Sequence, residues 1–119
     1  TGPFDVGQAV VVSGRHVLAV EAVEGTDGML GRIAELRATG RLRSPTGSGV
    51  LVKAPKRGQD RRFDLPSIGP QTVENVARAG LAGIAVVAGE TVVAEPERLI
   101  EAADRAKIFV VGVPSGPER

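Results

Sequence analysis

Hydrophobic residues along the chain form short Val-rich runs that alternate with segments in which apolar positions recur every three or four residues. Short apolar runs bounded by turn residues predict β-strands, and the helical spacing predicts amphipathic helices. The strands are expected at 8–13, 16–23, 49–54, 84–88, 91–94 and 108–113. Two helices are expected to begin at Pro70 and Pro96, since proline suits a first helical turn. A third, earlier helix is expected to be capped by Thr26 or Asp27 and ended by Gly40.

The predicted order of elements is ββαβαββαβ. Gly14-Arg15 and Gly89-Glu90 each separate two predicted strands and indicate hairpins. The remaining connections are long enough for parallel pairing, so the expected fold is α/β, a mixed β-sheet with about three helices packed on it. Residues 1–113 are expected to form this domain, and residues 114–119 a tail.

Length and composition fit a single globular domain of 119 residues with 42% hydrophobic residues. The net charge of +1 argues against a nucleic-acid-binding surface. The absence of cysteine excludes disulfides and thiolate metal sites, and no apolar run reaches the length of a transmembrane helix. The chain starts at Thr1 without a methionine, so we expect a fragment of a longer protein.

The most unusual segment is KAPKRGQDRRFDLPSIGP, residues 53–70. Residues 53–64 carry five cations and two carboxylates, a local charge of +3 against −2 for the rest of the chain. We call residues 54–66 the charged loop. This loop leaves a predicted strand and leads into a predicted helix at Pro70. Arginine can bind phosphate oxygens through two N–H groups, and lysine acts as a point charge, so the composition suits a phosphate group.

A second polar segment, Glu24–Asp27, follows the second predicted strand. Both segments are expected at the same edge of the sheet, where helix N-termini also present unpaired N–H groups to anions. Carboxylates from the two segments could hold Mg²⁺ together with substrate phosphates. The alternative that residue spacing leaves open is a solvated charged surface with exposed ion pairs.

Three quoted segments resemble one known family. VEAVEGTD (20–27), LVKAPKRGQDRRFDLPSIGPQTV (51–73) and AGLAGIAV (79–86) are similar to the LpxI family of UDP-2,3-diacylglucosamine pyrophosphatases. The resemblance runs from about residue 4 to residue 113 and covers the C-terminal domain of that family, whose N-terminal domain is absent from this chain. It implies hydrolysis of UDP-2,3-diacylglucosamine to lipid X and UMP with Mg²⁺ in lipid A biosynthesis.

The resemblance also implies roles for individual residues. Asp60 and Asp64 of the QDxRxD pattern are expected to be catalytic and to orient the attacking water, with Gln59 as a neutral donor. The carboxylates expected at the metal are Asp60, Asp64, Glu24 and Asp27. The expected substrate contacts are Lys53, Lys56, Arg62, Gly69, Thr72 and Thr26. A helix cap at Thr26 and a tight turn at Gly69 are the structural alternatives for those two residues.

Two classes of function follow from these expectations. The first is a pyrophosphatase domain that needs its N-terminal partner domain for activity. The second is a phosphate- or nucleotide-binding module without catalysis. For the first, the resemblance implies a Gram-negative enzyme located in the cytoplasm, peripheral to the inner membrane, with no nucleic-acid partner and with a homodimer as one compatible assembly.

Overall fold

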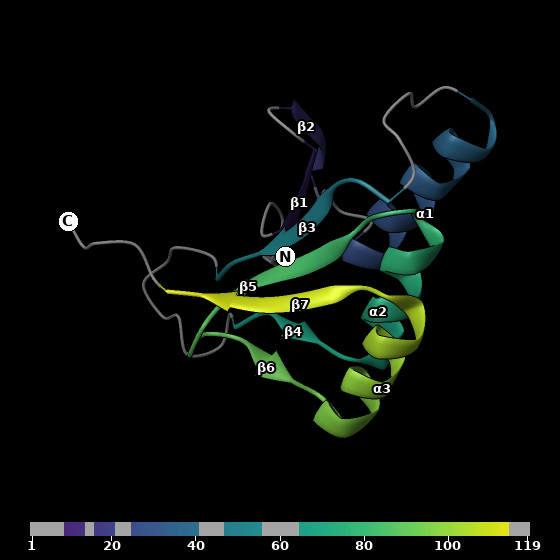
Figure 1. Ribbon diagram of the computed structural model, residues 1–119. Coiled ribbons are helices and arrows are strands. Elements are labelled where there is room, and N and C mark those ends of the chain that lie inside the picture. The colour runs from purple at the N-terminus through teal and green to yellow at the C-terminus, as the bar shows by residue number, and fades with distance from the viewer. Residues whose placement is uncertain (1–8, 14–15, 21–24, 41–46, 56–64, 115–119) are drawn as a thin grey trace.

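The computed structural model describes residues 9–13, 16–20, 25–40, 47–55 and 65–114 (Figure 1). In these residues the chain forms seven strands and three helices. The strands are β1 (Ala9–Ser13), β2 (His16–Val20), β3 (Val50–Lys53), β4 (Ser67–Ile68), β5 (Gly83–Val87), β6 (Val92–Val93) and β7 (Phe109–Val113). The helices are α1 (Gly25–Ala38), α2 (Pro70–Arg78) and α3 (Pro96–Ala106).

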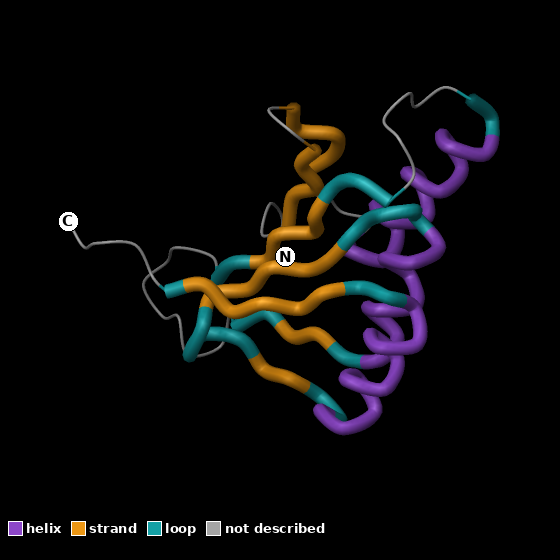
Figure 2. Tube along the Cα trace, in the orientation of Figure 1, coloured by secondary structure: helices purple, strands orange, loops and turns teal. Residues whose placement is uncertain are grey.

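Five of the strands form one mixed sheet in the order β2-β1-β3-β5-β7. β3, β5 and β7 are parallel, whereas β1 is antiparallel to both of its neighbours. Each connection between parallel strands passes through a helix, and the three helices lie together on one side of the sheet (Figure 2). The expected α/β fold with a mixed sheet and three helices is therefore confirmed.

The two predicted hairpins had different outcomes. β1 and β2 do pair as a hairpin, with a register shift between Val11 and Val12, while the turn residues 14–15 lie outside the described residues. The hairpin expected around Gly89-Glu90 is wrong. A turn is present there, with the Glu90 N–H donating to the Val87 carbonyl, but β5 pairs with β3 and β7. β6 instead pairs in parallel with β4, a two-residue strand that the sequence pattern did not predict.

The core forms between the sheet and the helices. Because side chains alternate along a strand, β1, β3 and β5 point Val11, Leu51 and Ile84 to the helix side, where each is 0% exposed. The helices supply the other half of this core through the fully buried residues Met29, Leu30, Ile33, Val73 and Val76. Ile68 of β4 joins the same cluster, which places the small β4–β6 sheet on the helix side as well.

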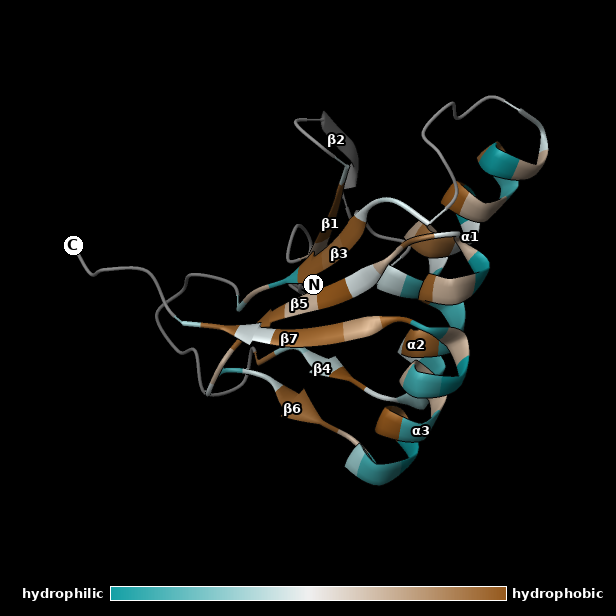
Figure 3. Ribbon diagram, viewed as in Figure 1, coloured by the Kyte–Doolittle hydropathy of each residue, from teal (hydrophilic) through white to brown (hydrophobic). Residues whose placement is uncertain are grey.

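The strands of the main sheet are apolar along most of their described length (Figure 3), so the opposite face of the sheet is apolar as well. It carries the alternate residues of each strand: Val10, Val12, Val50, Val52, Ala85, Val87, Phe109, Val111 and Val113. Those on β7 are the most open, with Phe109 43% exposed and Val111 and Val113 each 41% exposed. All helices in the described part of the chain pack on the face that carries Val11, Leu51 and Ile84.

Candidate functional site

Strand register brings the two candidate segments to one edge of the sheet. Val20, the last residue of β2, pairs with Val10, while Lys53, the last residue of β3, pairs with Ala9. The carboxyl ends of β2 and β3 therefore lie on either side of the start of β1. The strands that precede the two candidate segments therefore end at the same edge, as the sequence predicted, while Glu24 and residues 56–64 lie outside the described residues.

Lys53 joins the two ends of the charged loop. It lies on the same side of β3 as Leu51, so its side chain extends toward the helix side of the sheet. There its Nζ atom donates a hydrogen bond to the carbonyl oxygen of Ser67, the first residue of β4, at 2.8 Å. The cation expected to bind phosphate is thus held at the base of the loop.

Six of the eleven predicted site residues lie outside the described residues, among them all three predicted catalytic residues. The six are Glu24, Lys56, Gln59, Asp60, Arg62 and Asp64. Their roles stay predictions, and the site can be built only from Thr26, Asp27, Lys53, Gly69 and Thr72.

Gly69 and Thr72 come together in the first turn of α2. The backbone N–H of Gly69 donates to Thr72 Oγ1 at 3.1 Å, which is one of the two hydrogen bonds of a capping box, since glycine has no side chain to supply the other. Gly69 itself has an extended backbone, with φ −159°. Its N–H is therefore engaged within the protein, whereas the Thr72 hydroxyl hydrogen can still donate to a ligand. Substrate contact by these two residues stays a prediction.

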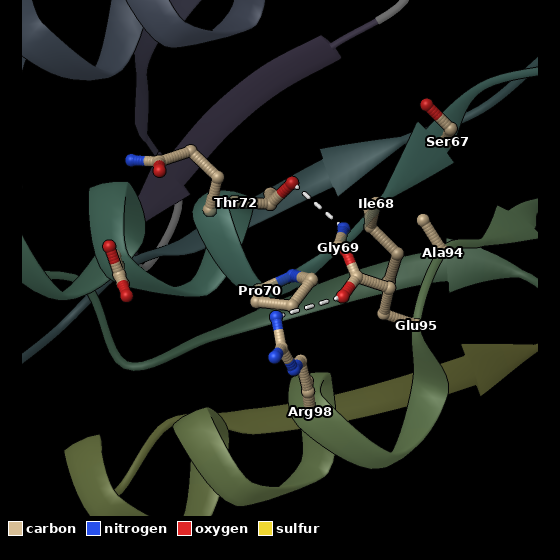
Figure 4. Close-up of a pocket in the computed structure, with 10 residues that line it drawn as sticks. Ser67, Ile68, Gly69, Pro70, Thr72, Ala94, Glu95 and Arg98 are labelled. Carbon is tan, nitrogen blue, oxygen red and sulfur yellow. Dashed lines mark hydrogen bonds and ion pairs between the residues drawn. The ribbon is translucent and has the colours of Figure 1, made fainter.

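A shallow pocket of about 360 Å³ opens beside this turn (Figure 4). Its walls come from β4 and the first turn of α2 on one side, and from the start of α3 on the other. Arg98 and Glu95 form an ion pair at its rim, with 3.2 Å between Nη1 and Oε1. Both side chains are well exposed, so this pair contributes little to stability and either group could be drawn to a ligand.

The first turn of α1 contains Thr26 and Asp27. The helix is assigned from Gly25, which has φ +80°, so Thr26 and Asp27 lie at its very start. The cap expected at one of these two residues stays a prediction. Thr26 is half-buried and Asp27 is exposed. Asp27 is instead bound from α2, because Asn75 Nδ2 donates to Asp27 Oδ1 at 2.8 Å.

Asn75 is a residue that the sequence pattern gave no reason to select. A single polar residue within a helix usually lies on a solvated face, and no motif marks it. Its connection to Asp27 spans 48 positions in the chain and depends on the packing of α1 against α2. Only the folded chain places this amide beside the acidic segment.

The described residues hold no group of three side chains that could bind a metal ion. Of the four carboxylates expected at Mg²⁺, only Asp27 is among them. Its carboxylate supplies oxygen ligands of the kind that Mg²⁺ prefers, so it fits the expected chemistry. Within the same residues, no helix combines the length and apolar character needed to cross a membrane.

Comparison with known proteins gives two matches that agree. The family model for the LpxI C-terminal domain matches residues 1–111. The UDP-2,3-diacylglucosamine pyrophosphatase LpxI of Caulobacter vibrioides is 52% identical over 112 residues. The match covers 94% of this chain but only 40% of that relative's length. The chain therefore belongs to the LpxI family, through the part that corresponds to its C-terminal domain.

Proposed function

We propose that this chain provides the catalytic residues for hydrolysis of the diphosphate bond in UDP-2,3-diacylglucosamine. Water would add to one phosphorus, the bridging P–O bond would break, and the products would be UMP and lipid X. The observation that carries the proposal is the 52% identity to a pyrophosphatase of that name over 94% of the chain.

The arrangement of the described residues supports the same reading. A diphosphate needs cations and N–H or O–H donors on one side and a means of activating water on the other. Lys53 and Thr72 provide a cation and a hydroxyl near the two ends of β4. Asp27 follows β2, which ends at the same sheet edge as β3.

In this proposal the basic residues hold the diphosphate and the carboxylates act on water. Lys53, Lys56 and Arg62 bind the phosphate oxygens, and Asp60 and Asp64 orient the attacking water with help from Gln59. Mg²⁺, when bound, would neutralise phosphate charge and lower the pKa of a bound water. The carboxylates that would hold it are Asp60, Asp64, Glu24 and Asp27.

We further propose that the domain works together with the remaining part of the LpxI protein. The matched segment is less than half of the Caulobacter relative, so a second region can contribute to the site. The acyl chains of the substrate would keep it at a membrane, and within this proposal that membrane is the cytoplasmic face of the inner membrane of a Gram-negative cell. A homodimer stays a prediction.

The proposal is tested with a chimera in which this chain replaces the matching 112 residues of the Caulobacter relative. The chimera and the isolated chain are each incubated with Mg²⁺ and UDP-2,3-diacylglucosamine, and UMP is measured by chromatography. We expect the chimera to release UMP, and we expect this release to stop when EDTA is added. A folded chimera that releases no UMP would overturn the proposed function.

The same experiment decides the second candidate, a nucleotide-binding module without catalysis. The open pocket beside α2 offers a hydroxyl from Thr72 and a guanidinium from Arg98, alongside the carboxylates of Glu74 and Glu95. The described residues hold no group of three side chains that could bind a metal ion, which favours binding without catalysis. Calorimetry with UMP and with UDP would then show binding by a chain whose chimera remains inactive.

A further inference from the structure

We propose that Asn75 positions the carboxylate of Asp27 in the candidate site, an inference that rests on the proposed function. The contact is short, 2.8 Å from Asn75 Nδ2 to Asp27 Oδ1, and it joins α2 to the first turn of α1. It bears on the one predicted metal-site carboxylate that lies among the described residues.

The orientation of the Asn75 amide is determined by its partners. Its carbonyl oxygen accepts from Arg78 Nη1 at 3.0 Å and from Gln71 Nε2 at 3.3 Å. Arginine can only donate and an ionised carboxylate can only accept, so the amide nitrogen must face Asp27. The amide is therefore held from both ends and presents a fixed donor to the carboxylate.

The choice of an amide has a chemical consequence. A lysine or arginine in the same place would orient Asp27 but would also neutralise its charge. A neutral donor orients one carboxylate oxygen and leaves the negative charge available to a cation or to water. Among the described residues, Asn75 is the hydrogen-bond partner of Asp27, and Arg78 is directed at the amide oxygen of Asn75.

A structural role alone explains the residue less well. Asparagine in the middle of a helix is less favourable than alanine, because its side chain competes for backbone hydrogen bonds. Position 75 is the sixth residue of the nine in α2, so the helix bears this cost in its interior. Carboxylates that bind metals are commonly held by hydrogen bonds from neighbouring residues, and the loss of such a partner lowers metal affinity or activity.

The test uses the chimera with Asn75→Ala, Asn75→Asp and, as a matched control, Thr39→Ala. Thr39 lies at the far end of α1, where its hydroxyl donates to the carbonyls of Glu35 and Leu36, so its loss also removes a helix contact. We expect Asn75→Ala to lower kcat by about 10–100-fold with little change in KM. Asn75→Asp should lower kcat further, since it places a second carboxylate against Asp27. Thr39→Ala should change only the melting temperature.

Two further measurements separate positioning from folding. In an Asp27→Ala background, Asn75→Ala should cause no additional loss of kcat, because the group through which it acts is gone. Binding of Mn²⁺ to the chimera without substrate, followed by electron paramagnetic resonance, should weaken in Asn75→Ala and not in Thr39→Ala.

The outcomes distinguish the inference from the function on which it rests. If the chimera is active and Asn75→Ala keeps kcat within twofold and Mn²⁺ binding unchanged, the positioning role is wrong and the proposed function stands. A loss of kcat that only follows the loss of folded protein, equally in Thr39→Ala, also overturns it. If the unsubstituted chimera folds and is inactive, the proposed function fails and the inference fails with it.

Discussion

At the scale of single residues, Lys53 combines a structural contact with a predicted contact to the substrate. Its bond to the Ser67 carbonyl fixes its side chain between the end of β3 and the start of β4. A cation held in this way loses less conformational freedom on binding a phosphate than a free surface lysine would. Its position at the base of the charged loop is what the sequence predicted, whereas the bond to Ser67 could not be foreseen, because β4 has only two residues.

We therefore expect Lys53→Met in the chimera to raise KM. Methionine keeps the apolar stem but removes the charge, and a lost charged hydrogen bond corresponds to about 1.5–3 kcal/mol, or roughly 10–150-fold. Steady-state kinetics of UMP release measures this effect. Lys107→Met, at the end of α3, serves as the control for loss of one positive charge. An unchanged KM in Lys53→Met would show that Lys53 has only a structural role at the base of the charged loop and does not bind the substrate.

The aspartates of the charged loop should behave differently from Lys53. We expect Asp60→Ala or Asp64→Ala to lower kcat by orders of magnitude, roughly 10²–10⁴-fold, while substrate still binds. A carboxylate that orients water acts mainly in the transition state, so its loss spares ground-state contacts. Kinetics run beside thermal melting checks this. Activity that falls only in proportion to folded protein would make these residues structural.

At the scale of secondary structure, the sequence predicted the Gly89-Glu90 turn correctly but predicted the wrong pairing partner for the strands on either side of it. The Gly89-Glu90 turn formed as expected, but β5 is an interior strand of the main sheet, and both of its edges are occupied, by β3 and β7. β6 therefore had to pair elsewhere, and β4 was available on the helix side. Strand pairing depends on the whole topology, so the residues around a turn could not reveal it.

The pairing of β5 with β7 requires a glycine at one position. Gly83 is opposite Phe109, and a Cβ atom at residue 83 would lie 2.4 Å from three atoms of the phenyl ring. We expect Gly83→Ala to lower the free energy of unfolding by about 1–3 kcal/mol, because the ring must move. Urea denaturation of Gly83→Ala in the native and in the Phe109→Ala background measures the cost. An equal cost in both backgrounds would contradict this steric explanation.

The end of α3 offers the opposite change, a stabilising one. Lys107 has the left-handed conformation, with φ +61° and ψ +42°, and Ile108 N–H bonds back to the Ala103 carbonyl. A residue other than glycine costs roughly 1–2 kcal/mol there, partly offset by the greater freedom of glycine in the unfolded chain. We expect Lys107→Gly to stabilise the fold by about 0.5–1 kcal/mol. Lys107→Ala, which keeps the strain, should not stabilise it, and calorimetric melting compares the two.

At the scale of the whole molecule, the described helices cover one face of the main sheet, and β2 and β3 end at the same edge of it. The edge was predictable from the sequence, since segments that follow parallel strands emerge together. The partners of Asp27 were not, because they depend on how α1 lies against α2. The pocket beside α2 is shallow and open to water, and exposed charges interact weakly across solvent.

This openness leads to the last prediction. We expect the isolated chain to unfold cooperatively and yet to release UMP at least about 100-fold more slowly than the chimera. Hydrolysis needs the diphosphate held in a fixed geometry away from bulk water, and this chain corresponds to only 40% of the Caulobacter relative. Both proteins are assayed at equal concentrations of folded chain, with the Asp64→Ala chimera as the blank. Turnover by the isolated chain within tenfold of the chimera would mean that this single domain contains a complete site, and that the remaining part of the LpxI protein serves binding of the acyl chains or delivery to the membrane.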